Sequence, residues 1–274
     1  MTTTTPLPVY FVSHGGPNLL DESDYPPTSA ISKALRKIGD DIRAQNPRAL
    51  LVLSGHWESN SGKSLQINGK SAFPKPLIYD FGGFPAWLYK EEFAHKTEPA
   101  LTQQIAQLLT QGGIPVETVD RGLDHGAWVV LKKAGLESAP FPIIQLSLFR
   151  NDSMPQHVHL GQLLAPLREQ GVVIVGSGMA VHNLRDYFGA SATSVRSYVR
   201  PFDKEIETAL LSGENREQAI LALSESDYLY KAHPTLEHLL PLHVAVGAAK
   251  GTANVEKILE AYQVSLSWSC YKFF

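Results

Sequence analysis

The sequence predicts a single α/β domain over residues 1–274, in which helices cover both faces of a mostly parallel or mixed sheet. Short apolar runs rich in Val, Ile and Leu recur along the chain, and longer stretches with helical spacing separate them. The runs are continuous rather than alternating in polarity, as strands buried on both faces require. No internal repeat or linker-like change in composition divides the 274 residues, although this length would allow two domains.

Five apolar runs are expected to form strands, the last of them with the weakest pattern. They are Val9–Val12, Leu50–Leu53, Ile143–Leu148, Val172–Val175 and Val116–Val119. Helical spacing predicts eight helices, at Thr28–Gln45, Glu98–Thr110, Ala127–Lys133, Pro155–Gln170, Val199–Leu211, Arg216–Leu223, Thr235–Ala249 and Val255–Tyr262. We expect Thr28 to cap the first helix, Gly112 and Gly113 to end the second, and Pro201 to lie near the start of the fifth.

The segment Ser59–Pro85 differs from the rest of the chain in its content of Gly, Pro, polar and aromatic residues. Such a composition predicts a long loop with at most one hairpin. Long ordered loops often wall a binding site, and the aromatic stretch Phe81–Trp87 would suit either a flat substrate ring or packing on the surface.

The composition excludes several classes of function. At 43% hydrophobic and 19% charged residues, the chain is a globular protein rather than a disordered one. Its net charge of -3 provides no basic surface for nucleic acid or an anionic membrane. A single cysteine, Cys270, leaves any metal to His, Asp or Glu. The N-terminus lacks a signal peptide and no run is long enough to cross a bilayer, so we expect a cytoplasmic protein.

Four histidines stand at glycine-rich turns. They are His14 in Ser13-His14-Gly15-Gly16-Pro17, His56 in Ser54-Gly55-His56-Trp57, His125 in Leu123-Asp124-His125-Gly126, and His182 in Ser177-Gly178-Met179-Ala180-Val181-His182-Asn183. His14, His56 and His182 directly follow apolar runs. Because the carboxyl ends of parallel strands line one crevice of an α/β sheet, the sequence predicts that these imidazoles share a site.

A further candidate lies in the segment His233-Pro234-Thr235-Leu236-Glu237-His238. Thr235 is expected to cap a helix whose first turn holds Glu237 and His238. Neighbouring helical residues point about 100° apart, so only one of the two can easily face a metal. Two or three strand-end histidines with one donor from this helix make a suitable metal site.

Simpler interpretations hold for the other motifs. Taken singly, a histidine at a strand end is more often a hydrogen-bonded turn residue than a ligand. His157 and His159 would point to different faces of a helix start, His233 before Pro234 marks a turn, and His95 and His243 have no supporting context. The run Gly176-Ser177-Gly178 lacks the third glycine of a dinucleotide-binding loop, and no serine lies in a G-x-S-x-G elbow.

Taken together and in this order, the five histidine motifs resemble those of the extradiol aromatic ring-opening dioxygenases. The match is most similar to the DOPA-dioxygenase branch, related to the catalytic subunit of protocatechuate 4,5-dioxygenase, and runs from residue 9 to about residue 249. This resemblance implies an α/β domain with a mononuclear non-haem metal at one edge of the sheet. It implies that a small aromatic diol and O₂ are the substrates.

The resemblance also implies roles for individual residues. His14, His56 and His238 resemble metal ligands, and His182 resembles either an acid/base beside the metal or a fourth ligand. His125 resembles a second pocket histidine that contacts substrate or O₂. Protocatechuate-type members use a glutamate ligand, whereas this segment offers both Glu237 and His238, so either residue is open as the ligand. Fe(II) is expected for activity, and Zn(II) suits an all-histidine site.

Two other functions stay open at this point: a zinc-dependent hydrolase, with Asp124 or Glu58 as base, and a catalytically silent protein that binds a metal or a small molecule. Arg185 is a candidate partner for a polar group of the substrate. The sequence leaves open whether the protein is a monomer or a homo-oligomer.

Overall fold

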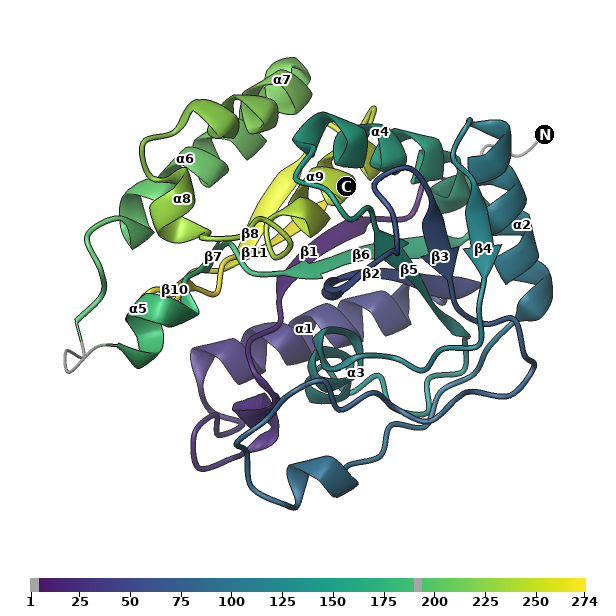
Figure 1. Ribbon diagram of the computed structural model, residues 1–274, viewed down its shortest axis with the longest axis horizontal. Coiled ribbons are helices and arrows are strands. Elements are labelled where there is room, and N and C mark those ends of the chain that lie inside the picture. Colours follow the sequence, from purple (N-terminus) through teal and green to yellow (C-terminus); the bar gives the residue numbers. More distant parts are fainter. Residues whose placement is uncertain (1–4, 190–193) are drawn as a thin grey trace.

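Eight strands form one mixed sheet in the computed structural model, which describes residues 5–189 and 194–274 (Figure 1). They lie in the order β4 (Val116–Thr118), β3 (Leu65–Ile67), β5 (Ile143–Leu148), β2 (Ala49–Glu58), β6 (Val172–Gly178), β1 (Val9–Ser13), β11 (Cys270–Phe273) and β8 (Val255–Leu259). The four central strands β5, β2, β6 and β1 are parallel, whereas β3 and β11 run antiparallel to their central neighbours. The predicted α/β class and all five predicted strands are confirmed.

Helices pack on both faces of this sheet, as the continuous apolar strands predict. On one face lie α1 (Ala30–Ala44) and α3 (His125–Lys133), and on the other lie α2 (Pro99–Gln111), α4 (Met154–Leu164) and α9 (Leu240–Ala248), with α6 (Val199–Leu210) and α7 (Arg216–Leu221) beyond them (Figure 1). Side chains of one strand divide between the two cores: Tyr10 and Val12 join the first, Val9 and Phe11 the second. Because successive side chains of a strand point to opposite faces and both faces are buried, successive positions of the strand are apolar.

A small second sheet lies beside the carboxyl ends of the central strands. It pairs β7 (Val181–His182) with β10 (Leu266–Ser267) and β10 with β9 (Tyr262–Gln263). The short helices α5 (Leu184–Phe188) and α8 (Leu229–Ala232) adjoin it. Short 3₁₀ helices occupy Pro17–Leu20, Leu88–Lys90, Ala165–Gln170, Gly213–Asn215 and Ala222–Glu225. β7 holds His182 beside the main sheet.

The predicted helix Val255–Tyr262 is wrong. These residues form β8 and the start of β9, because β8 pairs antiparallel with β11 at the end of the chain. No sequence pattern predicts β11, whose backbone pairs with β8 and favours its extended conformation. Pairing with a distant strand thus overrides the local helical pattern.

The predicted helix Thr235–Ala249 begins five residues late, at Leu240. Pro241 accounts for this start, since proline is tolerated in the first turn of a helix but not in its interior. The Thr235 hydroxyl donates to Glu237 Oε1 at 3.0 Å rather than capping a helix. Glu237 and His238 therefore lie in the turn before α9. At the first helix, Ser29 rather than Thr28 is the cap, accepting from Ser32 N at 3.1 Å.

The segment 59–85 contains β3 but no local hairpin, since β3 pairs with β4 and β5. After β3 the chain crosses the sheet edge without regular structure until Leu88. None of the helices that the structure describes is both long and apolar enough to cross a membrane.

Candidate metal centre

Three of the predicted ligands meet at the carboxyl ends of the central strands. His14 follows β1, His56 lies near the end of β2, and His238 lies in the turn before α9. His56 Nε2 is 3.2 Å from His14 Nε2 and 3.1 Å from His238 Nε2. Because β1 and β2 flank β6 in parallel, the ends of both strands deliver their imidazoles to one place.

The opposite nitrogen of each ring has its own hydrogen-bond partner. His14 Nδ1 lies 3.1 Å from Ser177 Oγ, whose hydroxyl donates to Gly126 O at 2.5 Å, so the imidazole donates to Ser177. His238 Nδ1 donates to Glu237 Oε1 at 2.9 Å, and His56 Nδ1 faces Asp80 Oδ2 at 3.4 Å. These partners favour the tautomer that leaves a lone pair on each Nε2.

The three nitrogens fit a metal ion. Unprotonated Nε2 atoms at 3.1 and 3.2 Å repel one another unless a cation lies among them, and neutral imidazole is a common ligand of zinc and iron. His14 and His238 are buried, and burial, followed by the neighbouring histidines, lowers the pKa of both. Both rings are therefore neutral, as ligands must be.

Two more histidines lie beside this cluster: His182 in β7 and His125 at the start of α3. The His182 ring stacks on that of His238, with centroids 3.7 Å apart and planes 18° apart. Burial, followed by the nearby His125, lowers the pKa of His182 to about 4. His125 is the first residue of α3, and its ring centroid lies 3.9 Å from that of His56. The structure thus brings all five predicted histidines together.

Asp80 belongs to the site, although no sequence pattern predicts it. Its Oδ1 accepts from His125 Nδ1 at 2.9 Å and from His125 N at 3.0 Å, while Oδ2 faces His56. Partial burial would raise the pKa of Asp80, but the hydrogen bonds and charge of His125 prevail and lower it to about 2. One carboxylate therefore orients two of the site histidines.

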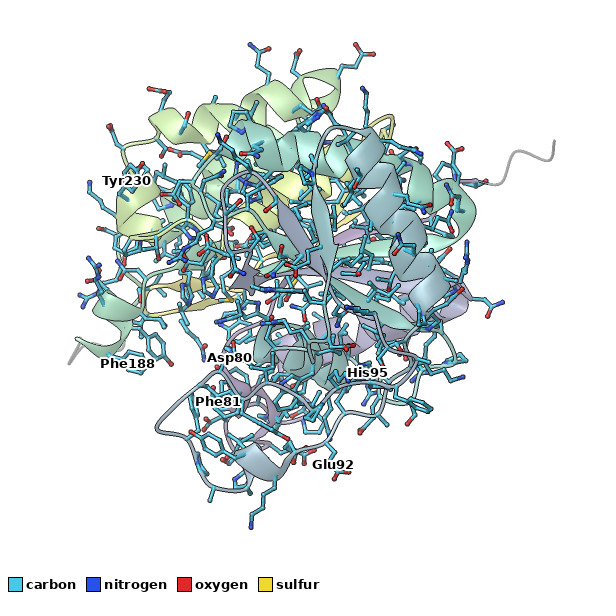
Figure 2. All side chains as sticks on the ribbon, turned by 45° about the vertical axis from the view of Figure 1, so that its right-hand side comes forward. Asp80, Phe81, Glu92, His95, Phe188 and Tyr230 are labelled. Carbon is cyan, nitrogen blue, oxygen red and sulfur yellow. The ribbon has the colours of Figure 1, made fainter. Side chains whose placement is uncertain are left out.

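A cavity of about 670 Å³ opens in front of the histidines. Its aromatic lining comprises Tyr25, Phe81, Phe84, Tyr187, Phe188 and Trp268. In Figure 2, Phe188 on α5 lies on one side of the opening, and Asp80 and Phe81 on the loop lie on the other. The predicted role of the loop 59–85 as a wall of the site is thus confirmed for its last part. The size and lining suit a small aromatic molecule.

Comparison with known proteins identifies the family. Residues 8–273 match the family described as the catalytic LigB subunit of aromatic ring-opening dioxygenase. This chain belongs to the LigB family. The expectation that the protein is an extradiol aromatic ring-opening dioxygenase is confirmed at the level of the family. Enzymes of this family use a non-haem metal, and the cluster of His14, His56 and His238 could hold one.

Relatives of this LigB-family chain match it over nearly its full length. A Beta vulgaris protein named 4,5-DOPA dioxygenase extradiol is 36% identical over 269 residues, 96% of this chain and 95% of the relative. A protein of the same name from Escherichia coli K12 is 31% identical, covering 96% and 92% of the two chains. A crystal structure of an uncharacterized protein from Escherichia coli K12 superposes with a TM-score of 0.78 at 26% identity, over 98% of this chain and 100% of the other.

The other histidines of this LigB-family protein do not join the metal cluster. His157 and His159 lie on different faces of α4, the first buried and the second exposed, as predicted. His233 is buried and its Nε2 donates to Ala180 O at 2.9 Å. His243 is buried in α9, and His95 lies half-buried near the surface.

Proposed function

We propose that the protein is an extradiol dioxygenase that opens a catechol-type ring at a single metal ion. The observation that carries the proposal is the convergence of three Nε2 atoms at the inner end of an aromatic-lined cavity, with two more histidines beside them. The names of the relatives, 4,5-DOPA dioxygenase extradiol, support the same activity. Family membership favours it over a zinc-dependent hydrolase or a silent binding protein.

His14, His56 and His238 would hold the metal, with Glu237 orienting His238 rather than binding the ion. We propose Fe(II) for activity, and Zn(II) as an ion that the purified protein can retain, because three imidazoles also suit zinc. His182 is proposed as the acid/base residue, or as a fourth ligand in a resting form. When bound, the metal would lower the pKa of the catechol hydroxyls and allow electron transfer to O₂.

The protein side chains would then bind the ring and move the protons. The aromatic walls around Phe81 and Trp268 would orient the flat catechol with its two oxygens toward the histidine cluster. His182, which is neutral, would accept a proton from a catechol hydroxyl. His125, held by Asp80, would donate a proton as the O–O bond breaks. Both atoms of O₂ enter the product, which is a ring-opened semialdehyde carboxylic acid.

Oxygen uptake is the experiment that tests this proposal. The protein is reconstituted anaerobically with Fe(II), and uptake is measured with catechol, protocatechuate and DOPA while absorbance follows a yellow product. We expect uptake that depends on Fe(II) and is lost with Zn(II). His56→Ala should lose the metal, whereas His125→Ala should keep it and lose turnover. A single tightly bound metal without any uptake would contradict the proposal and favour a hydrolase or a binding protein.

The cellular location and the oligomeric state of the enzyme are also proposals. We propose a cytoplasmic enzyme, on the basis of its composition, that acts as a monomer or a homo-oligomer.

A further inference from the structure

We infer that Arg185 binds an anionic substituent of the substrate, so that the enzyme prefers catechols with a side-chain carboxylate to neutral or cationic catechols. This preference rests on the proposed ring-opening function, and it concerns a part of the cavity away from the metal ligands. Arg185 lies on α5, three residues after His182, and lines the cavity.

The acidic side chains that line the cavity have partners, whereas its one basic side chain, Arg185, has none among the described residues. Asp80 and Glu237, the two carboxylates of its lining, are already engaged by His125 and His238. Arg185 is the only lysine or arginine among the described lining residues. Its side chain is exposed, and within residues 5–189 and 194–274 its guanidinium has neither an ion pair nor a hydrogen bond. The cavity therefore presents one unmatched positive charge.

The acid next to Arg185 does not neutralise it. Asp186 accepts from Tyr198 OH at 2.8 Å and lies 4.0 Å from Arg196 Nε. Its backbone N donates to the side chain of Asn183, which caps α5. Asn183 Nδ2 also donates to Lys231 O at 2.7 Å, and this bond fixes the start of the helix. Arg185 thus lies on a short helix whose start is fixed by Asn183. This helix directly follows His182, whose ring stacks on that of His238.

The chemistry of the cavity selects the kind of substituent. A guanidinium matches the two oxygens of a carboxylate with paired hydrogen bonds. An ammonium group would meet no free carboxylate, because Asp80 and Glu237 are held by histidines. The aromatic side chains Tyr187 and Phe188 on the same helix also line the cavity, where they would cover the apolar part of a substrate between the ring and its charged end. Dihydroxyphenyl carboxylic acids satisfy all of these features.

The test compares three catechols of similar size: 3,4-dihydroxyphenylpropionate, 4-ethylcatechol and dopamine, which carry a carboxylate, no charge and an ammonium. Binding to the Fe(II)-loaded protein is titrated without O₂, and kcat/KM is measured with O₂. We expect the carboxylate to bind about tenfold more tightly than 4-ethylcatechol, as one charge-assisted contact provides. Raising the salt concentration should reduce this difference. Dopamine should bind no better than 4-ethylcatechol.

Variants assign the preference to Arg185. Arg185→Gln should abolish the advantage of the carboxylate over 4-ethylcatechol, and Arg185→Lys should restore part of it. Arg200→Gln removes an exposed arginine of α6 outside the cavity lining and should retain the wild-type preference. Two results would overturn the role of Arg185 without contradicting the proposed function. One is cleavage of all three catechols with equal kcat/KM, and the other is a preference that survives Arg185→Gln. Absence of cleavage of any catechol by the wild-type enzyme overturns the proposed function as well.

Discussion

His238 Nδ1 donates a hydrogen bond to Oε1 of Glu237, its neighbour in sequence, across 2.9 Å. The sequence left either residue open as the metal ligand, and this contact supports the proposal that His238 binds the metal while Glu237 orients it. The carboxylate faces the outer nitrogen of the imidazole, while His238 Nε2 lies 3.1 Å from His56 Nε2. Such carboxylate–histidine pairs fix the ring orientation and raise the basicity of the ligand nitrogen.

We therefore predict different effects for two substitutions at this pair. His238→Ala should remove most of the bound metal, whereas Glu237→Gln should keep it with an affinity lowered about tenfold. Metal content after dialysis and a competition titration with a chelator measure both effects. Glu214→Gln, which changes an exposed glutamate elsewhere, is the control. Full metal content in the His238 variant together with loss in the Glu237 variant would reverse the assignment.

Asp80→Asn should lower both the metal affinity and the turnover rate. The carboxylate faces the Nδ1 atoms of both His56 and His125, and an amide with one oxygen cannot accept from both. We expect metal affinity to fall about tenfold to hundredfold, as with other residues that orient ligands. Turnover at saturating metal should also fall, because His125 loses its partner. Asp120→Asn, an exposed site near Lys75, should match the wild type in both assays.

The histidine cluster could be predicted because sequence order and sheet geometry determine it together. His14 and His56 directly follow apolar runs, and parallel strands place such positions at one edge. Asp80 has no comparable signal. Its position depends on contacts between distant parts of the chain, such as the hydrogen bond from Ile78 N to Leu123 O and the close packing of Gly122 against Pro76 O. These contacts leave no periodic pattern in the sequence.

The C-terminal strands were missed for a related reason. β11 lies between β1 and β8, so its extended conformation depends on pairing with residues more than 250 positions away in one case. Local propensity could not distinguish a strand from a helix at Val255–Leu259, because the extended conformation of β8 depends on its pairing with β11. Local signals sufficed for β1, β2, β5 and β6, whose continuous apolar runs are buried on both faces of the sheet.

Acid should destabilise the protein partly through His157, which lies outside the metal site. Burial lowers the pKa of His157 to about 4, and its Nε2 has no hydrogen-bond partner in the described structure. Since the folded-state pKa lies below the unfolded value of about 6.5, this contribution is complete above pH 6.5 and is lost as the pH falls toward 4. The loss amounts to about 3 kcal/mol.

Urea denaturation between pH 7 and pH 4 measures this effect. His157→Asn keeps a donor for Ser153 O but cannot titrate, so its free energy of unfolding should fall by about 3 kcal/mol less than that of the wild type over this range. His159→Asn changes an exposed histidine two residues away and is the control. Identical pH dependence in the His157 variant and the wild type would show that another group causes the acid sensitivity.

Gly126→Ala should disturb the metal site without removing any ligand. A Cβ at this position would lie 2.4 Å from Ser54 Oγ, 2.8 Å from His56 Cδ2 and 3.2 Å from His14 Cε1. All three neighbours are held by other contacts: Ser54 Oγ accepts from His56 N at 3.1 Å, the His56 ring faces Asp80, and His14 donates to Ser177. Ser177 in turn donates to the carbonyl of Gly126 itself. The added methyl group must therefore displace α3 or the two histidines.

We expect Gly126→Ala to lower metal affinity by more than about tenfold, because ligand orientation is what this packing holds, and to destabilise the apoprotein by about 1–3 kcal/mol. Metal titration and urea denaturation of the metal-free protein measure the two effects separately. Gly82→Ala makes the same chemical change where a Cβ would meet no atom within 4 Å, so it should keep wild-type metal affinity. Equal metal affinity in both variants would show that the approach of α3 to β2 does not set the ligand geometry.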